Sequence, residues 1–149
     1  MNHPDIDKRF RKFLADQEGA IEQLREFVGG EVGPRLDGSV QSLELLDAFV
    51  ESLRRDSNWA RSPLFEGFAG DPLSWLTVRL AYYFGEILVR RFGSEWQLSR
   101  DRAPNVPVIL VGELELSPLE VASSYLAGQV HGGLLGLLVD LEARLAVRN

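Results

Sequence analysis

The strongest constraint on the fold is a mostly apolar segment that begins at Asp71 and Pro72 and ends at Gly93. Aspartate is a favoured N-cap, proline is favoured at the first helical position, and glycine readily adopts the left-handed conformation that ends a helix. Apolar residues lie on nearly every side of this segment, as in "LAYYFGEILV". A helix that is apolar nearly all round is contacted on several sides. The sequence therefore predicts a central helix over residues 72–92.

The remaining segments predict an α+β fold. Hydrophobic residues at helical spacing predict helices over residues 4–28, from Ser39 or Ser42 to Arg55, over 118–128 and over 133–147. Two further segments, 94–99 and 106–116, predict strands that "RDRAPN" joins as a hairpin. We therefore expect about five helices and a two- or three-stranded antiparallel β-sheet.

We expect these elements to form one domain over residues 1–149, with the helix at 4–28 packed on an α+β core at about 36–147. Side chains alternate along a strand, so the longer strand should place Val108, Leu110, Leu114 and Leu116 on one face. The long connection before the central helix contains Trp59, Phe65 and Phe68. These aromatic residues predict a loop that packs on the body of the protein.

Composition restricts the classes of function. The chain has no cysteine, which excludes disulfides, thiolate metal sites and cysteine nucleophiles. The first residues, "MNHPDIDKRFRKF", lack the apolar core of a signal peptide, and the apolar run "GGLLGLLV" is far too short to cross a membrane. We therefore expect a cytoplasmic protein without membrane binding.

The charge of the chain favours a basic protein partner. The net charge of −6 at pH 7 predicts repulsion from nucleic-acid phosphate. Direct nucleic-acid binding would require a segregated basic patch, and the arginines at 54 and 55, 90 and 91, and 100 and 102 occur as separated pairs. We expect no direct binding to nucleic acid, whereas a basic protein surface would be attracted.

No catalytic motif stands out. The two histidines are His3 and His131, and neither has another histidine or a cysteine at metal-ligand spacing. His131 lies at a glycine-flanked break, where a loop or capping role is favoured over that of a lone general base. The sequence has no nucleophile elbow and no phosphate-binding loop. We expect no catalytic residue, no metal and no cofactor.

A row of acids is the first candidate site, for binding a partner. Glu44, Asp47 and Glu51 fall at i, i+3 and i+7, which places them on one face of a helix, and Asp37 lies just upstream. Such a row could bind a basic partner or weakly hold a divalent cation. We favour the alternative, a solvated helix face on which Arg55 partly neutralises Glu51.

The second candidate is a ligand pocket on the central helix. Tyr82, Glu86 and Arg90 lie one turn apart, and Trp96 follows the end of the helix. Glu86 could be a general acid or base in a pocket lined by Tyr82 and Trp96. It could instead form a structural ion pair with Arg90 or Arg79, as a half-buried carboxylate requires. Because no histidine or second acid converges on it, we favour the ion pair.

The last predicted helix carries leucines on one side, at positions 134, 137, 138, 141 and 145. We expect this side either to be buried against the first helix or to form a homodimer with a second copy. Burial within the chain is favoured.

Two segments resemble parts of small uncharacterised bacterial domain families. "LDGSVQSLELLDAFVESL" (36–53) resembles their opening helix motif, and "LAYYFGEILVRRFGSEWQL" (80–98) is similar to the helix, glycine and tryptophan hairpin entry that follows it. The resemblance covers about residues 36–126 and implies an α+β fold with a helix, hairpin, helix core. It implies no catalytic residues. Some bacterial domains of this size act as immunity or accessory proteins.

The leading hypothesis is a non-enzymatic acidic interaction protein that binds a protein partner, with a bacterial immunity or accessory role. The alternative is a small-molecule-binding protein or an enzyme that uses a pocket of Tyr82, Glu86, Arg90 and Trp96.

Overall fold

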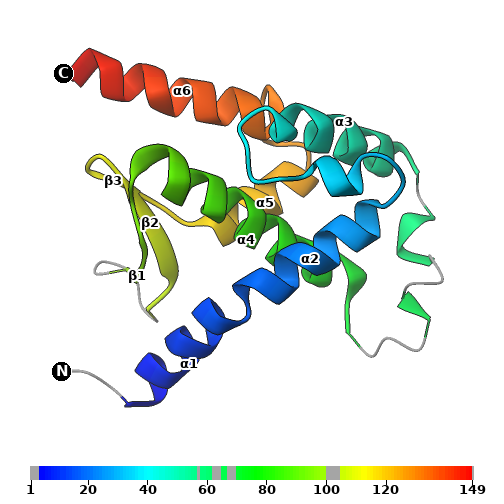
Figure 1. Ribbon diagram of the computed structural model, residues 1–149, viewed down its shortest axis with the longest axis horizontal. Helices are drawn as coiled ribbons and strands as arrows, with labels where there is room; N and C mark the ends of the chain where they lie inside the picture. The colour runs from blue at the N-terminus through cyan, green and yellow to red at the C-terminus, as the bar shows by residue number, and fades with distance from the viewer. Residues whose placement is uncertain (1–3, 57, 62–64, 67–69, 100–104, 149) are drawn as a thin grey trace.

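The computed structural model describes residues 4–56, 58–61, 65–66, 70–99 and 105–148. Figure 1 shows its elements in chain order: α1 (Pro4–Ala15), α2 (Gln17–Val28), the short 3₁₀ helix η1 (Gly33–Arg35), α3 (Ser42–Arg55), η2 (Trp59–Arg61), α4 (Pro72–Phe92), β1 (Trp96–Leu98), β2 (Pro107–Val111), β3 (Leu114–Leu116), α5 (Pro118–Leu126) and α6 (Gly133–Arg148). Within the described residues, six α-helices and a three-stranded antiparallel sheet make the predicted α+β fold.

Helix α4 lies at the centre, as its apolar sequence predicts. The Asp71 carboxylate accepts hydrogen bonds from the backbone N–H groups of Leu73 (3.2 Å) and Ser74 (3.4 Å), and Gly93 ends the helix with a φ of 64°. Nine of its residues are buried, from Leu76 to Leu88. α4 packs against α2, α5 and β2, which explains why it is apolar on several sides. Truncating one fully buried leucine of such a core typically costs about 2–5 kcal/mol.

The predicted N-terminal helix is divided at Asp16 into α1 and α2. Helical hydrogen bonds continue across the division, from Asp16 N to Lys12 O (2.9 Å) and from Ala20 N to Asp16 O (3.0 Å). The two helices therefore follow each other as one bent rod, with α1 at the lower left of the view and α2 continuing toward its centre (Figure 1). Ala20, Ile21 and Leu24 of α2 are buried, and α2 packs on α4.

The expectation of one strand over 106–116 is wrong. β2 and β3 pair antiparallel with Val111 opposite Leu114, so Gly112 and Glu113 form a two-residue turn. Gly112 has a φ of 63°, and among the described residues only glycines have a positive φ. A positive φ at the first turn position alone is typical of a type II′ hairpin turn. The signal was present in the sequence, because glycine is the residue that this turn position favours.

The predicted face that joins Val108 and Leu110 to Leu114 and Leu116 is wrong for the same reason, because the register places Leu116 and Leu114 opposite Ile109 and Val111. Leu110 is 36% exposed and Leu114 is 40% exposed, whereas Val108, Ile109 and Val111 are buried. β2 is the middle strand of the order β1-β2-β3 and packs against both α4 and α5. Because it is covered on two sides, adjacent residues are buried and the simple alternation fails.

Helix α5 begins at Ser117, whose hydroxyl accepts a hydrogen bond from the Glu120 N–H (3.3 Å), as the "SPLE" sequence favours. Helix α6 buries Leu134, Leu138 and Leu141. The expectation that α6 packs on the first helix is wrong, because it packs on α3, on the opposite side of α4 from α1 (Figure 1).

The aromatic loop before α4 packs on the body, as predicted for Trp59 and Phe65. The ring of Phe27 lies at the centre, with the rings of Phe49, Trp59, Phe65 and Trp75 at centroid distances of 5.9, 6.2, 5.8 and 5.6 Å. Phe68 lies outside the described residues. The cluster joins α2, α3 and α4 to the loop at one end of the molecule.

Candidate functional site

Asp47 does not lie on an exposed acidic face as predicted, because both of its carboxylate oxygens accept hydrogen bonds within the protein. Its Oδ1 accepts hydrogen bonds from the Tyr125 hydroxyl (2.6 Å) and the Leu134 N–H (3.0 Å), and its Oδ2 accepts one from the Leu135 N–H (3.1 Å). The half-buried carboxylate thus caps the N-terminus of α6 from α3. Burial, followed by the hydrogen bond to Asp47, raises the pKa of Tyr125 far above its usual value. Asp47 is therefore a structural residue.

The other three acids of the predicted row are exposed but separate into two places. Asp37 and Glu44 line one hollow of about 450 Å³ together with Arg35. Glu51 lies further along α3 and forms an exposed ion pair with Arg55 (2.7 Å). Hydrogen bonds from the side chain and the backbone N–H of Ser39 lower the pKa of Asp37. Asp37 and Glu44 therefore line the same hollow, whereas Glu51 is paired with Arg55.

Glu86 and Arg90 form the expected ion pair, with Arg90 Nη2 3.0 Å from Glu86 Oε1. The pair is not enclosed, because the Glu86 side chain is 25% exposed and the Arg90 side chain 58%. Arg90 also donates to the Asp37 backbone oxygen (3.3 Å), so it joins α4 to the segment before α3. The other candidate, Arg79, instead donates to Gln23 (3.0 Å) and lies over the Trp75 ring.

Tyr82 and Trp96 do not share an open pocket with Glu86 and Arg90. The Tyr82 hydroxyl donates to the Phe13 backbone oxygen (2.8 Å), and the Phe13 ring lies 4.6 Å from the ring of Tyr82 and 4.9 Å from that of Trp96. Both residues are buried beneath α1. Burial raises the pKa of Tyr82 to about 12. The four predicted ligand-pocket residues thus divide into an aromatic cluster and an exposed ion pair.

Glu86 and Arg90 do line a groove of about 480 Å³ between α2 and α4. Two acids of α2, Glu18 and Glu22, lie on its other side with Arg25. A second hollow of about 360 Å³ adjoins this groove, shares Glu22 and Arg25, and extends to Glu26 and Pro34. Pro34 also lines the hollow that contains Asp37 and Glu44. The three hollows are therefore neighbours along one side of the molecule.

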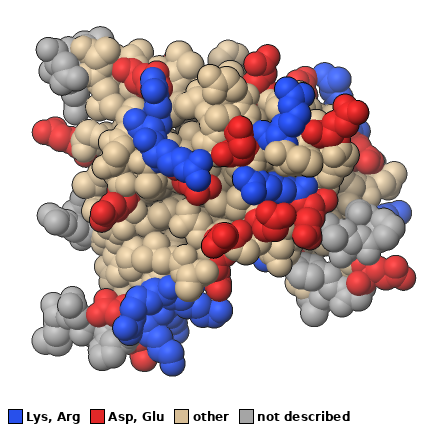
Figure 2. Space-filling model, in the orientation of Figure 1, with Lys and Arg blue, Asp and Glu red and all other residues tan. Residues whose placement is uncertain are grey.

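The acids along these hollows form what we call the acidic band: Glu18, Glu22, Glu26, Asp37, Glu44 and Glu86. Figure 2 shows acidic side chains gathered over α2 on this face. Sequence analysis missed its main component, although Glu18, Glu22 and Glu26 recur at i, i+4 and i+8 and all are exposed. That spacing was the available signal.

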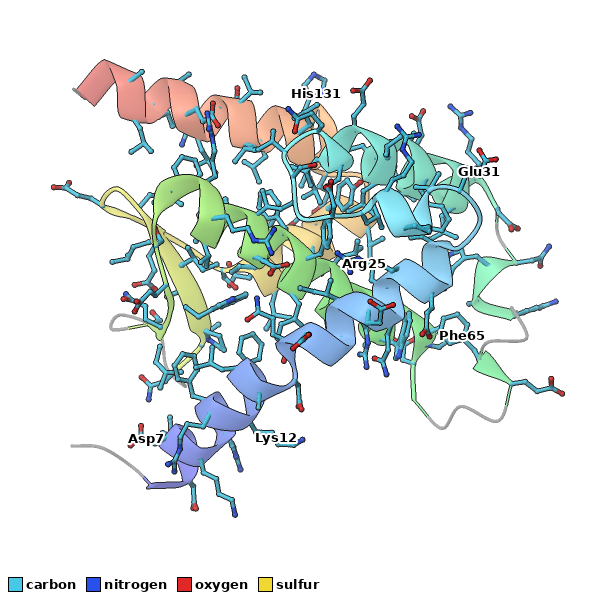
Figure 3. All side chains as sticks on the ribbon, viewed as in Figure 1. Asp7, Lys12, Arg25, Glu31, Phe65 and His131 are labelled. Atoms are coloured by element: carbon cyan, nitrogen blue, oxygen red, sulfur yellow. The ribbon has the colours of Figure 1, made fainter. Side chains whose placement is uncertain are left out.

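Two of the three arginines along the band, Arg25 and Arg90, are held by the protein itself. Arg25, labelled in Figure 3, donates through Nε to the Leu36 backbone oxygen (2.5 Å) and pairs with Glu22 (3.4 Å). Arg90 is occupied by Glu86 and the Asp37 backbone. Among the described residues, by contrast, Glu18, Glu26 and Glu44 make no ion pair or side-chain hydrogen bond. Arg35, which also lines these hollows, is exposed and makes no ion pair among the described residues, so the groups left available are mainly carboxylates with this one arginine.

Basic residues are clustered after all, on α1. Lys8, Arg9, Arg11 and Lys12 are exposed there, and Figure 2 shows the basic side chains gathered over this helix. The expectation that cationic residues occur only as separated pairs is therefore wrong. Lys12, labelled in Figure 3, pairs with Asp16 at 3.2 Å. Basic α1 and acidic α2 follow each other directly along the chain.

His131 is exposed and lines a hollow of about 430 Å³ between α5 and α6 with Glu120, Ser124 and Asp140.

In the part of the chain that the structure describes, no group of three or more histidine, aspartate or glutamate side chains could hold a metal ion. Of the helices described, none has the length and apolar character needed to cross a membrane. Comparison with protein-family models, with curated proteins and with solved structures found no match to this chain.

Proposed function

We propose that this protein is a non-enzymatic interaction protein whose acidic band binds a cationic segment of a protein partner. The observation that carries the proposal is the set of three adjoining hollows, in which carboxylates outnumber arginines six to three. A long, shallow and acidic surface suits an extended arginine- or lysine-rich segment better than a small molecule. Complementary charge of this kind accelerates association and disfavours wrong partners.

Three features support a cationic ligand. Arg25 and Arg90 donate to backbone oxygens of residues 36 and 37, so both guanidinium groups already have acceptors within the protein. Glu18, Glu26 and Glu44 are exposed and lack a partner within the described chain. Asp37 keeps its negative charge at lower pH than an ordinary aspartate, because Ser39 stabilises the carboxylate. The surface therefore offers acceptors for guanidinium or ammonium groups.

The test measures binding of a fluorescently labelled oligo-arginine peptide by anisotropy. The variant Glu18→Lys, Glu26→Lys, Glu44→Lys removes the three unpaired acids of the band. Its matched control, Glu66→Lys, Glu95→Lys, Asp140→Lys, changes the net charge equally at exposed positions outside the band. We expect the band variant to weaken binding about tenfold or more and the control to change it much less. Exposed substitutions of this kind typically shift stability by less than about 0.5 kcal/mol each, so both proteins should fold.

Equal loss of binding in the two variants would mean that the peptide responds to net charge alone, and the proposal would fail. A bacterial immunity or accessory role is one form of this function and rests on the resemblance of residues 36–126. Binding of the purified product of the neighbouring gene, lost in the band variant and kept in the control, is the result expected for that role.

A further inference from the structure

One exposed stripe runs the whole length of the α1–α2 rod. It consists of six exposed residues that follow one another at alternating spacings of four and three: Lys8, Lys12, Ala15, Gly19, Glu22 and Glu26. Alternating spacings of three and four keep residues on one side of a helix and are the pattern of helix-pairing seams. The helical hydrogen bonds that continue through Asp16 keep α1 and α2 in phase. We call these six residues the α1–α2 stripe.

The chemistry of the stripe is antisymmetric about its middle. Its N-terminal end carries two lysines, its C-terminal end carries two glutamates, and its centre has the two small residues Ala15 and Gly19. A Cβ at Gly19 would meet nothing within 4 Å, so the centre is open. Lys8 and Glu26, Lys12 and Glu22, and Ala15 and Gly19 each lie equally far along the chain from Gln17.

We propose that the α1–α2 stripe is a self-complementary surface that pairs with the same stripe of a second copy. In an antiparallel pair related by a two-fold axis near residue 17, Lys8 of each copy faces Glu26 of the other and Lys12 faces Glu22. Every interaction then occurs twice, as an isologous interface requires. Ala15 and Gly19 meet at the axis, where small side chains allow two helix backbones to approach closely.

Charge complementarity selects a second copy as the occupant of this stripe. The stripe carries two lysines and two glutamates, so it has no net charge and offers no uniformly basic face to nucleic acid or anionic lipid. A second copy presents acids at the same one-turn spacing as the lysines. The proposal rests on the proposed function in that Glu22 and Glu26 belong to the acidic band, and it names α1 of another copy as one cationic segment that the band binds.

The test is sedimentation equilibrium of two charge-reversal variants, alone and mixed. The first is Lys8→Glu, Lys12→Glu, and the second is Glu22→Lys, Glu26→Lys. In a homodimer of either variant, all four facing pairs carry like charges. In the mixture, all four carry opposite charges. We expect the wild type to dimerise reversibly, each variant alone to dimerise at least about tenfold more weakly, and the equimolar mixture to recover the dimer. The wild-type dimer should weaken between about 0.05 and about 0.5 M NaCl.

A variant that changes packing without charge provides an independent readout. Gly19→Gln replaces a poor helix former at an open position, so it should raise the melting temperature of the monomer. The larger side chain should also separate the two helices at the axis and weaken the dimer. Opposite changes in the two measurements are expected only if Gly19 lies in an interface.

Three results would overturn the proposal: a wild-type mass that stays monomeric at every concentration and salt, a dimer that persists in both charge variants alone, or a mixture that remains monomeric. The second of these would place the interface elsewhere, for example on α6. Oligo-arginine binding, measured at protein concentrations below those at which the mass rises, separates this failure from failure of the proposed function. A protein that stays monomeric and binds the peptide refutes only the dimer, whereas a protein that dimerises at high concentration but does not bind the peptide as a monomer refutes the broader proposed function.

Discussion

Removing the Asp47 carboxylate should destabilise the protein far more than removing any exposed acid. In Asp47→Ala, the Tyr125 hydroxyl and the N–H groups of Leu134 and Leu135 lose the acceptors that lie 2.6–3.1 Å away. A lost helix cap costs about 0.5–2 kcal/mol, and a buried donor left unsatisfied costs about 1–3 kcal/mol. Together these give an expected loss of about 2–4 kcal/mol in the free energy of unfolding. In a chain of this size, about 3 kcal/mol lowers the melting temperature by roughly 6–12 °C.

The assay is urea unfolding followed by far-UV circular dichroism, with Glu44→Ala as the control. Glu44 lies one turn before Asp47 on the same helix, is exposed, and should cost less than about 0.5 kcal/mol. Asp47→Asn should fall between the two, because its amide oxygen keeps one acceptor. In a double-mutant cycle, Tyr125→Phe should cost much less in Asp47→Ala than in the wild type. If the free energy of unfolding of Asp47→Ala lies within about 0.5 kcal/mol of that of Glu44→Ala, Asp47 behaves as a surface residue and the capping role is refuted.

Three further predictions follow from other contacts. Glu86→Ala should lower the free energy of unfolding by less than about 1 kcal/mol, because Arg90 is more than half exposed and is hydrated when its partner is removed. A loss above about 3 kcal/mol, measured by thermal melts, would instead indicate an enclosed charge. Gly85→Ala should destabilise the folded protein by about 1–3 kcal/mol despite the better helix propensity of alanine, because the added Cβ would overlap the buried Trp96 ring. An increase in stability would show that the ring moves aside. All three tyrosines have raised pKa values, so the unfolded chain releases their protons first and stability should fall as pH rises above 10.0. Tyrosinate absorbance should then appear together with unfolding in an alkaline titration, whereas absorbance that precedes the loss of circular dichroism would contradict this.

Local signals in the sequence determined most of the fold. Asp71, Pro72 and Gly93 define the limits of α4, because capping and backbone conformation depend on atoms within a few residues of one another. The all-round apolar character of α4 likewise predicted its central place. The turn at Gly112 was equally local, so the division of β2 from β3 could have been predicted from the glycine alone.

Tertiary structure alone decided what the individual acids do. Nothing near Asp47 in the sequence distinguishes it from Glu44, and its hydrogen-bond partners lie 78 to 88 residues further along the chain. Only tertiary packing, with α6 against α3 and Tyr125 of α5 beside them, brings those donors to one of the two carboxylates. The acidic band likewise joins α2, the segment before α3 and α4, which are distant in sequence. Side-chain spacing fixes which residues share a helix face, whereas the neighbour that covers that face depends on how all the helices pack.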